Sequence, residues 1–212
     1  MIIAIDGPTA SGKGTIAKAL ATHFGLPHLD TGLLYRAVGL QVARSGGNPD
    51  DANDALAGTG FAESLLDDPA LRSEETGALA SRVSVHPAVR AALLARQQAF
   101  AAEPGGAVLD GRDIATVIAP QAQAKLFITA SVAARALRRW LEMQKRGETA
   151  TREAIEADLA ARDERDRTRA AAPLRQADGA ALLDTSALPI EAAIAAAIAL
   201  VEKQVAASGP KE

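Results

Sequence analysis

The stretch from Ile2 to Thr15 constrains the fold of this chain more than any other. Ile2 to Ile5 is a short apolar run rich in β-branched residues, which predicts a buried strand. Gly7 to Lys13 then fits the phosphate-loop pattern G-x-x-x-x-G-K. From Thr15 onward, apolar residues recur at helical spacing. A strand, a glycine-rich loop and the start of a helix, in this order, predict a loop that binds a polyphosphate.

The chemistry of the loop follows from its residue types. Glycines are needed because side chains would keep the backbone N–H groups away from a phosphate. The helix that follows presents a positive dipole end to the anion, and Lys13 supplies a mobile charge for the β- and γ-phosphates. Gly14 follows the lysine and the hydroxyl of Thr15 comes next. This G-K-G-T ending is similar to that of nucleoside monophosphate kinases.

Composition excludes several classes of protein. The chain has 212 residues, of which 48% are hydrophobic and only 3% aromatic, so we expect alanine-rich helices packed closely on a sheet. A net charge of −3 argues against a general nucleic-acid or membrane-surface binder. The absence of cysteine excludes disulfides and thiolate metal sites. With no signal peptide and no apolar run long enough for a membrane span, we expect a cytoplasmic protein.

Strands alternate with helices along the chain, which predicts a parallel sheet covered on both faces. A helix from Leu33 to Arg44 follows the second strand, with Thr31 as its expected N-cap. Pro189 starts the final helix, which we expect to reach about Val205 and to be followed by a frayed tail, residues 206–212. The strands expected after the first are His28–Asp30, Ala107–Leu109, Lys125–Thr129 and Ala180–Asp184.

The segment between the second and third strands reads as a mostly helical lobe, about residues 48–103. Its helical pattern is broken at His86-Pro87, and Pro87 fits the first turn of a new helix. The third strand runs into Asp110-Gly-Arg-Asp113, which we expect to lie in a site because ligands bind at the carboxyl edge of open α/β sheets.

Two arginine-rich helices precede the last strand. The first, Ser131 to Gly147, has Ser131 as its expected N-cap and places Arg135, Arg138 and Arg139 on one face. The second, Arg152 to Arg169, contains a run of mixed charge. Spacing alone favours a solvated surface for both clusters, and ordinary helix positions for Tyr35 and Arg36.

Five collinear blocks of sequence are spread over nearly the whole chain: IDGPTASGKGT (Ile5–Thr15), LDTGLLYRA (Leu29–Ala37), ASRVSVHPAVRAALLARQ (Ala80–Gln97), DGRDIATVI (Asp110–Ile118) and ARDERDRTRAAAPL (Ala161–Leu174). In these blocks the chain resembles the bacterial cytidylate kinase family. Five such blocks are far more specific than a phosphate loop alone. They favour a substrate cleft over a solvated surface for Tyr35, Arg36 and the mixed-charge run.

The resemblance implies an α/β phosphate-loop kinase fold with a five-stranded parallel sheet flanked by helices. Three parts are implied: a core of about residues 1–47, 104–130 and 170–205, a monophosphate-binding lobe of about 48–103, and a lid of about 131–169. Similar proteins often carry a small sheet in the lobe, for which Gly58 to Ser73 looks too short. The implied reaction transfers the γ-phosphoryl group of MgATP to CMP or dCMP. A monomer is the expected state.

Functional residues are carried over only where the blocks match. Lys13, Arg112 and Arg139 are the expected electrostatic catalysts, and Thr15 is the expected contact of the nucleotide-bound Mg²⁺. Arg135 is expected to close on the transferred phosphoryl group together with Arg139. The expected donor-phosphate loop is Gly7, Pro8, Thr9, Ala10, Ser11, Gly12, Lys13, Gly14 and Thr15. The expected acceptor contacts are Arg36, Arg112 and Arg169 for the phosphate, Ser81, Arg90 and Asp113 for cytosine, Arg162 and Asp166 for the ribose, and Thr31 and Tyr35 along the cleft.

Two alternatives remain at this stage. Another small kinase with a G-K-G-T loop, such as an adenylate or shikimate kinase, is disfavoured by the DGRD and RDERDRTRAAAPL blocks. A non-catalytic phosphate-loop protein is disfavoured by the presence of Lys13, Thr15 and the arginine set. Turnover of ATP with and without CMP separates these classes.

Overall fold

The computed structural model describes residues 1–207 and is built on a five-stranded sheet in which every strand pair is parallel. The strand order is β2-β3-β1-β4-β5, so the strand that precedes the phosphate loop lies at the centre. The predicted α/β fold is therefore confirmed. The strands are β1 (Ile2–Asp6), β2 (His28–Asp30), β3 (Ala107–Gly111), β4 (Ala124–Thr129) and β5 (Ala181–Asp184).

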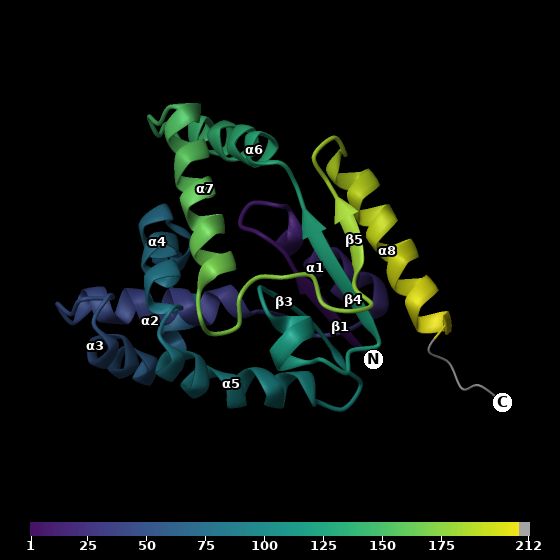
Figure 1. The fold of residues 1–212 in the computed structure, drawn as a ribbon, viewed down its shortest axis with the longest axis horizontal. Helices are drawn as coiled ribbons and strands as arrows, with labels where there is room; N and C mark the ends of the chain where they lie inside the picture. The colour runs from purple at the N-terminus through teal and green to yellow at the C-terminus, as the bar shows by residue number, and fades with distance from the viewer. Residues whose placement is uncertain (208–212) are drawn as a thin grey trace.

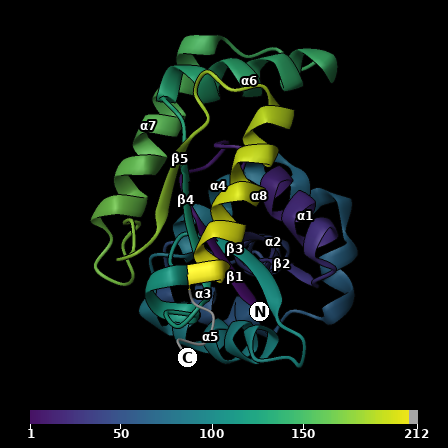
Figure 2. The same ribbon diagram turned by 90° about the vertical axis from the view of Figure 1, so that its right-hand side faces the viewer.

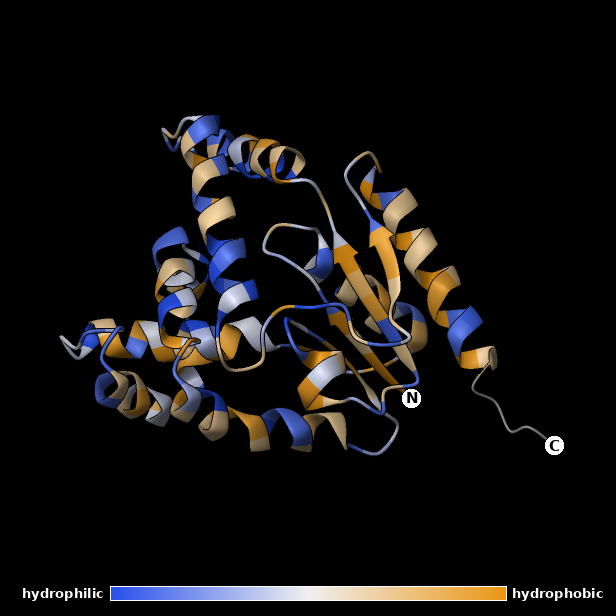
Figure 3. Ribbon diagram, viewed as in Figure 1, coloured by the Kyte–Doolittle hydropathy of each residue, from blue (hydrophilic) through white to orange (hydrophobic). Residues whose placement is uncertain are grey.

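Helices α1 (Lys13–Phe24) and α8 (Ile190–Ala207) cover one face of the sheet (Figures 1 and 2). Side chains alternate along β1, because Ile3 and Ile5 pack against these two helices whereas Ala4 packs on the opposite face. The strands carry apolar residues on both faces, and β4 and β5 are orange in Figure 3. A central strand buried on both faces fixes the direction in which the phosphate loop leaves the sheet.

Residues 31–101 are helical and have an apolar core of their own, and they include most of the segment of about 48–103 for which a helical lobe is predicted. No strand occurs among residues 31–106, which agrees with the absence of the small sheet. Pro87 opens a helix as predicted, and Ser73 caps the preceding one through the N–H of Thr76. The lobe helices are α2 (Thr31–Arg44), α3 (Ala52–Ala57), α4 (Glu74–Val83) and α5 (Pro87–Ala101), with 3₁₀ turns at Gly58–Gly60, Glu63–Asp67 and Pro69–Arg72.

Helices α6 (Val132–Lys145) and α7 (Arg152–Thr168) lie together beyond the carboxyl end of β4 (Figure 1). Ser131 caps α6 as predicted, and its side chain accepts a hydrogen bond from the N–H of Ala134. Ala136 is buried between the two helices. Both helices stand over the sheet edge where the phosphate loop emerges, so their arginines can reach it.

Two local predictions are wrong. Asp30, not Thr31, caps α2, because β2 ends directly at the helix and the Asp30 carboxylate accepts the N–H of Gly32 at 2.9 Å. The Thr31 hydroxyl instead donates to the carbonyl of Asp110 at 2.8 Å. A frayed tail is predicted for residues 206–212, but residues 206 and 207 belong to α8. The rest of the predicted tail, 208–212, lies outside the described residues. Within residues 1–207, every helix is too short or too polar to span a bilayer.

Candidate active site

The phosphate loop runs from the end of β1 to the start of α1 with a tightly constrained backbone. Gly7 passes directly over β4, and a Cβ at this position would lie 1.9 Å from the carbonyl oxygen of Ile128. Gly12 has φ +87° and caps α1, a left-handed conformation that favours glycine. Lys13 is the first residue of the helix. The loop therefore delivers the N-terminus of α1 and its lysine to one point, as an anion site requires.

Protein groups engage the carbonyl oxygens of this loop. The Thr9 carbonyl accepts a hydrogen bond from Nη1 of Arg135 at 3.0 Å, and the Ser11 carbonyl accepts one from the Thr185 hydroxyl at 2.9 Å. The Ser11 hydroxyl is buried and has no hydrogen-bond partner. Carbonyls held by the protein leave the N–H groups of the loop available to a bound anion.

Two cavities adjoin at Lys13. One, of about 460 Å³, is bounded by the loop, α6 and the start of α8, and includes Arg138 and Thr185. The other, of about 340 Å³, lies among the loop, α2, α4, the segment after β3, and α7. The lining residues that both cavities share are Ala10, Lys13, Gly14, Arg139 and Glu142. Two ligands could thus meet over the lysine, one from each side.

Lys13 lies in an environment that disfavours its charge. The pKa of its ammonium is lowered to about 8, mainly by burial and also by the nearby Arg112 guanidinium, while Asp110 and Asp30 oppose the shift. Burial also raises the pKa of Asp30, and the neighbouring Asp110 carboxylate adds to that rise. An anion bound over Lys13 would raise this pKa again and stabilise the ammonium, so the site is suited to phosphate.

The second cavity is lined by arginines that lack a full set of counter-charges. Burial lowers the pKa of Arg162 to about 9, and the nearby Arg112 contributes to the shift. Burial likewise lowers the pKa values of Arg36, Arg139 and Arg169. Nε of Arg162 and Nη2 of Arg169 are buried without a hydrogen-bond partner. Buried unpaired donors are costly, and an anionic ligand would satisfy them.

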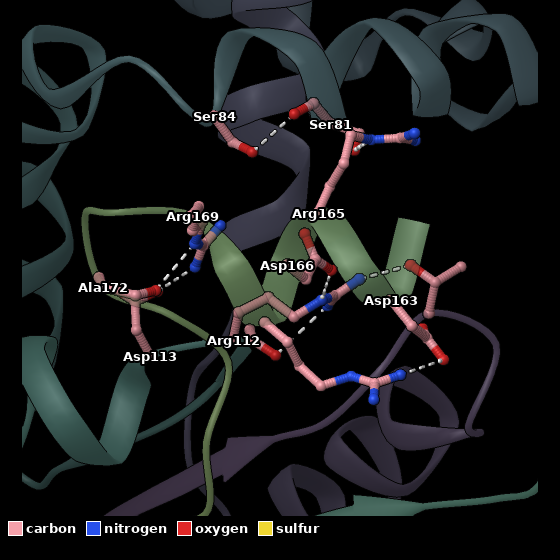
Figure 4. Close-up of polar contacts among 12 residues, drawn as sticks. Ser81, Ser84, Arg112, Asp113, Asp163, Arg165, Asp166, Arg169 and Ala172 are labelled. Atoms are coloured by element: carbon pink, nitrogen blue, oxygen red, sulfur yellow. Dashed lines mark hydrogen bonds and ion pairs between the residues drawn. The ribbon is translucent and has the colours of Figure 1, made fainter. Parts of the chain in front are cut away.

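The phosphate end of this cavity contains Arg112 and Arg36. Arg112 donates from Nε to Asp166 on α7 at 2.8 Å and from Nη2 to the Thr9 hydroxyl (Figure 4). Arg36 donates from Nη1 to the carbonyls of Leu71 and Ser73 at 2.7 and 2.8 Å. Both guanidinium groups line the cavity, so the structure brings these two predicted phosphate contacts together.

The predicted base-reading residues lie on the same cavity wall. Arg90 on α5 is paired with Asp113, and its guanidinium lies 5.5 Å from the centre of the Tyr35 ring. The Ser81 hydroxyl accepts a hydrogen bond from Nε of Arg165 at 3.3 Å (Figure 4). Ser81 lies on α4, Arg90 on α5 and Asp113 after β3, so only the folded chain brings them together.

The arginines of α6 separate in the structure. Arg139 lines both cavities and is paired with Glu74 on α4, and Arg138 donates to the Thr185 hydroxyl at 3.1 Å. Arg135, in contrast, is 2% exposed, lines neither cavity and is paired with Asp163. The prediction that Arg135 faces the transferred phosphoryl group is therefore wrong, because its guanidinium is committed to buried partners.

Comparison with known proteins decides the family. The cytidylate kinase family matches residues 3–203. The chain belongs to the cytidylate kinase family. A cytidylate kinase of Xanthobacter autotrophicus is 60% identical over 202 residues, which cover 95% of this chain and 97% of the relative. Cytidylate kinases of Rhodopseudomonas palustris and a Bradyrhizobium species are 57% and 56% identical over 203 residues, covering 95% of this chain and 96% of each relative.

As a member of the cytidylate kinase family, the chain is a kinase that acts on nucleotides. The cavity walls contain residues that sequence reasoning did not single out, among them Asp30, Glu74, Glu142 and Thr185. Asp30 ends a short strand beside the sheet edge, which is a signal that could have identified it. The others lie on helices or loops whose approach to the site only the tertiary structure shows.

Proposed function

We propose that this chain transfers the γ-phosphoryl group of MgATP to CMP or dCMP, giving ADP and CDP or dCDP. One observation carries the proposal, the meeting of two cavities over Lys13 and Arg139. A hydrolase needs room for one nucleotide and a water molecule, whereas a phosphotransferase needs two nucleotide sites whose phosphates face each other. Family membership supports the same assignment.

ATP would occupy the cavity bounded by the phosphate loop, α6 and α8. The loop residues 7–15 would hold its phosphates through backbone N–H groups and the Lys13 ammonium. Its nucleoside would extend toward Arg138 and Leu188, which line this cavity but not the other one. Arg139 would face the γ-phosphate, because it lines both cavities.

The residues around the loop fit a magnesium ion that arrives with the nucleotide. Thr15 is exposed at the start of α1, and a Cβ on Gly14 would lie 3.9 Å from Asp110 Oδ2, so carboxylate and hydroxyl oxygens flank the loop. Residues 1–207 contain no cluster of three carboxylate, histidine or cysteine ligands. Such a site suits Mg²⁺, which keeps most of its waters and binds through one or two protein groups and the phosphates. Bound there, it would neutralise charge on the β- and γ-phosphates.

CMP would occupy the cavity between the helical lobe and α7. Arg36, Arg112 and Arg169 would hold its phosphate by planar, bidentate contacts. Arg162 and Asp166 would meet the ribose. The proposed cytosine contacts are Ser81, Arg90 and Asp113, with Thr31 and Tyr35 lining the cleft.

The proposed reaction needs charge control more than proton transfer. An oxygen of the CMP phosphate attacks the γ-phosphorus, and the bond to the β–γ bridging oxygen breaks, releasing ADP. The attacking group is already an anion near neutral pH, so no strong base is required. Lys13, Arg112 and Arg139 would hold the two polyanions together and stabilise the charge that spreads over the transferred group. This role explains why so many cations converge without sufficient counter-charges.

We further propose that the chain works in three parts. A core of about residues 1–47, 104–130 and 170–205 would carry the phosphate loop, residues 48–103 would close on CMP, and residues 131–169 would act as a lid. The ion pair between Glu74 and Arg139 connects the last two parts across the cavity. Closure of this kind excludes water from the transferred group.

The decisive experiment is ADP production from MgATP with CMP, dCMP, UMP, AMP or shikimate supplied separately. We expect strong turnover with CMP and dCMP alone. Turnover led by UMP or AMP would leave phosphoryl transfer intact but contradict the base-reading assignment. No turnover with any acceptor, together with measurable ATP binding, would contradict the kinase assignment itself. A Lys18→Ala variant, altered at an exposed lysine on α1, serves as the control and should show the same turnover with each acceptor as the natural protein.

A further inference from the structure

Arg135 connects segments that are distant in the sequence. Its Nε donates to the carbonyl of Ala130 at 2.9 Å, and Nη1 donates to the carbonyl of Thr9 at 3.0 Å. Nη1 also donates to Oδ1 of Asp163 at 3.1 Å, and Nη2 donates to Oδ2 of the same carboxylate. One buried guanidinium thus joins β4, the phosphate loop and α7.

The contact with Thr9 bears on the shape of the phosphate loop. Ala10, the next residue, has φ +60°, a left-handed conformation that costs a non-glycine residue about 1 kcal/mol. Such a conformation persists only where surrounding groups hold it. Arg135 holds the carbonyl that precedes Ala10, so it fixes the orientation of the Thr9–Ala10 peptide next to the donor phosphates.

The contact with Asp163 bears on the acceptor. Asp163 lies on α7 between Arg162 and Asp166, both of which line the second cavity. Asp163 is itself buried and lines neither cavity. Its carboxylate binds Arg135 through both oxygens, so the position of α7 is tied to that of the phosphate loop.

The stability of the fold does not by itself require the ion pair between Arg135 and Asp163. Taking two charges out of water is expensive, and apolar residues of similar volume often replace a buried ion pair without loss of stability. An apolar pair could fill the space between α6 and α7, where Ala136 and Leu159 already pack. It could not donate a hydrogen bond to Thr9.

We propose that Arg135 is a positioning residue that couples the two substrate sites. It holds the phosphate loop in its binding shape from one side and the acceptor-binding helix α7 from the other. Occupation of one site therefore orders the other, and ATP and CMP bind more tightly together than separately. The proposal rests on the proposed function for the identity of the two ligands.

The test uses Arg135→Met combined with Asp163→Leu, which replaces the ion pair by apolar residues. Binding of a non-hydrolysable ATP analogue is measured by calorimetry with and without CMP, alongside thermal unfolding, kcat and both KM values. In the natural protein we expect CMP to tighten analogue binding at least about fivefold. The double variant should melt within a few degrees of the natural protein, lose most of this coupling, and have kcat lowered about tenfold or more.

Two further variants keep the outcome interpretable. Arg135→Lys retains the charge beside Asp163, so this variant should fold even if the double variant does not. A lysine cannot reach Thr9 and Asp163 together, so the variant should lose coupling. Arg82→Gln with Asp50→Asn removes an exposed ion pair that lines neither cavity and should leave coupling unchanged. Natural coupling and kcat in a folded Arg135 variant would overturn the proposal. The proposal would also be overturned if the natural protein transfers phosphate but its ATP and CMP sites show no coupling. If the natural protein does not transfer phosphate at all, that result would count against the proposed function instead.

Discussion

Arg90 donates a hydrogen bond to Asp113, and both residues line the acceptor cavity, the one proposed to bind CMP. Nη2 of Arg169 lies 3.8 Å from the other oxygen of the same carboxylate. Asp113 therefore holds two arginines, one from α5 and one from the end of α7. Its remaining capacity to accept a hydrogen bond suits the exocyclic amine of cytosine, whereas uracil presents an oxygen at that position.

Replacing Asp113 by Asn should weaken discrimination between CMP and UMP. An amide can turn its NH₂ group toward the uracil oxygen, so we expect the ratio of kcat/KM for CMP to that for UMP to fall about tenfold or more. The KM for ATP should change by less than about twofold, because Asp113 does not line the donor cavity. Steady-state kinetics with both acceptors measure the ratio. Asp178→Asn, at an exposed position before β5, is the matched control, and an unchanged ratio would remove Asp113 from base reading.

Arg36→Ala should weaken CMP binding while sparing ATP. Arg36 lines only the acceptor cavity, and losing its proposed bidentate contact with the CMP phosphate should raise the KM for CMP about tenfold or more. The same arginine holds the carbonyls of Leu71 and Ser73, so a modest loss of thermal stability is expected as well. Arg44→Ala, at the far end of the same helix, controls for general damage to α2. Unaltered CMP affinity would reject the phosphate contact.

Sequence patterns correctly predicted where the contiguous motifs lie in the fold. The loop from Gly7 to Thr15 and the segment from Asp110 to Asp113 lie where their patterns placed them, at the carboxyl edge of a parallel sheet. The position of Arg112 between the loop and α7 was not predictable from spacing. It depends on a hydrogen bond to Asp166, 54 positions further along the chain.

The arginines of α6 show why the remainder could not be predicted. Helical spacing correctly places Arg135 and Arg139 one turn apart, but not which neighbour each one meets. Asp163 lies opposite Arg135 because α7 returns alongside α6, and Glu74 reaches Arg139 from the helical lobe. Arg135 is buried in its contact with Asp163, whereas Arg139 remains at the cavity wall in its contact with Glu74. This difference is set by tertiary packing, and it decides which residue can touch a phosphate.

Lys13→Ala should abolish phosphoryl transfer, with kcat lowered about a thousandfold or more, because no other lysine lines either cavity within residues 1–207. The natural enzyme should also reveal the pKa of Lys13. Since that pKa is lowered to about 8, the ammonium loses its proton as the pH rises through 8 and kcat/KM for ATP should decline there. Bound phosphates favour the ammonium, so kcat at saturating ATP should decline only at a higher pH. Identical profiles for the two parameters would contradict this assignment, as would near-natural kcat in the variant.

Asp6 should make the stability of the fold depend on pH. This carboxylate, at the end of β1, accepts the N–H groups of Ile114 and Ala115 at 2.8 and 2.9 Å and so anchors the turn after Asp113. Burial raises its pKa from 3.8 to about 6, despite the opposing effect of those two hydrogen bonds. Between these values the folded state binds more protons than the unfolded state, so the free energy of unfolding falls as the pH rises.

The stabilising contribution is thus fully present below about pH 4 and is lost as the pH rises through 6, with a size on the order of 3 kcal/mol. Asp6→Asn removes this titrating carboxyl and leaves every other titrating group of the chain in place. The difference in free energy of unfolding between the natural protein and this variant should therefore decline from pH 4 to pH 6.5 and then level off. Urea unfolding at a series of pH values measures it, and taking the difference cancels groups that titrate alike in both proteins. A difference that stays constant over this range, or grows with pH, would show that Asp6 is ionised throughout and that its two hydrogen bonds outweigh the cost of burial.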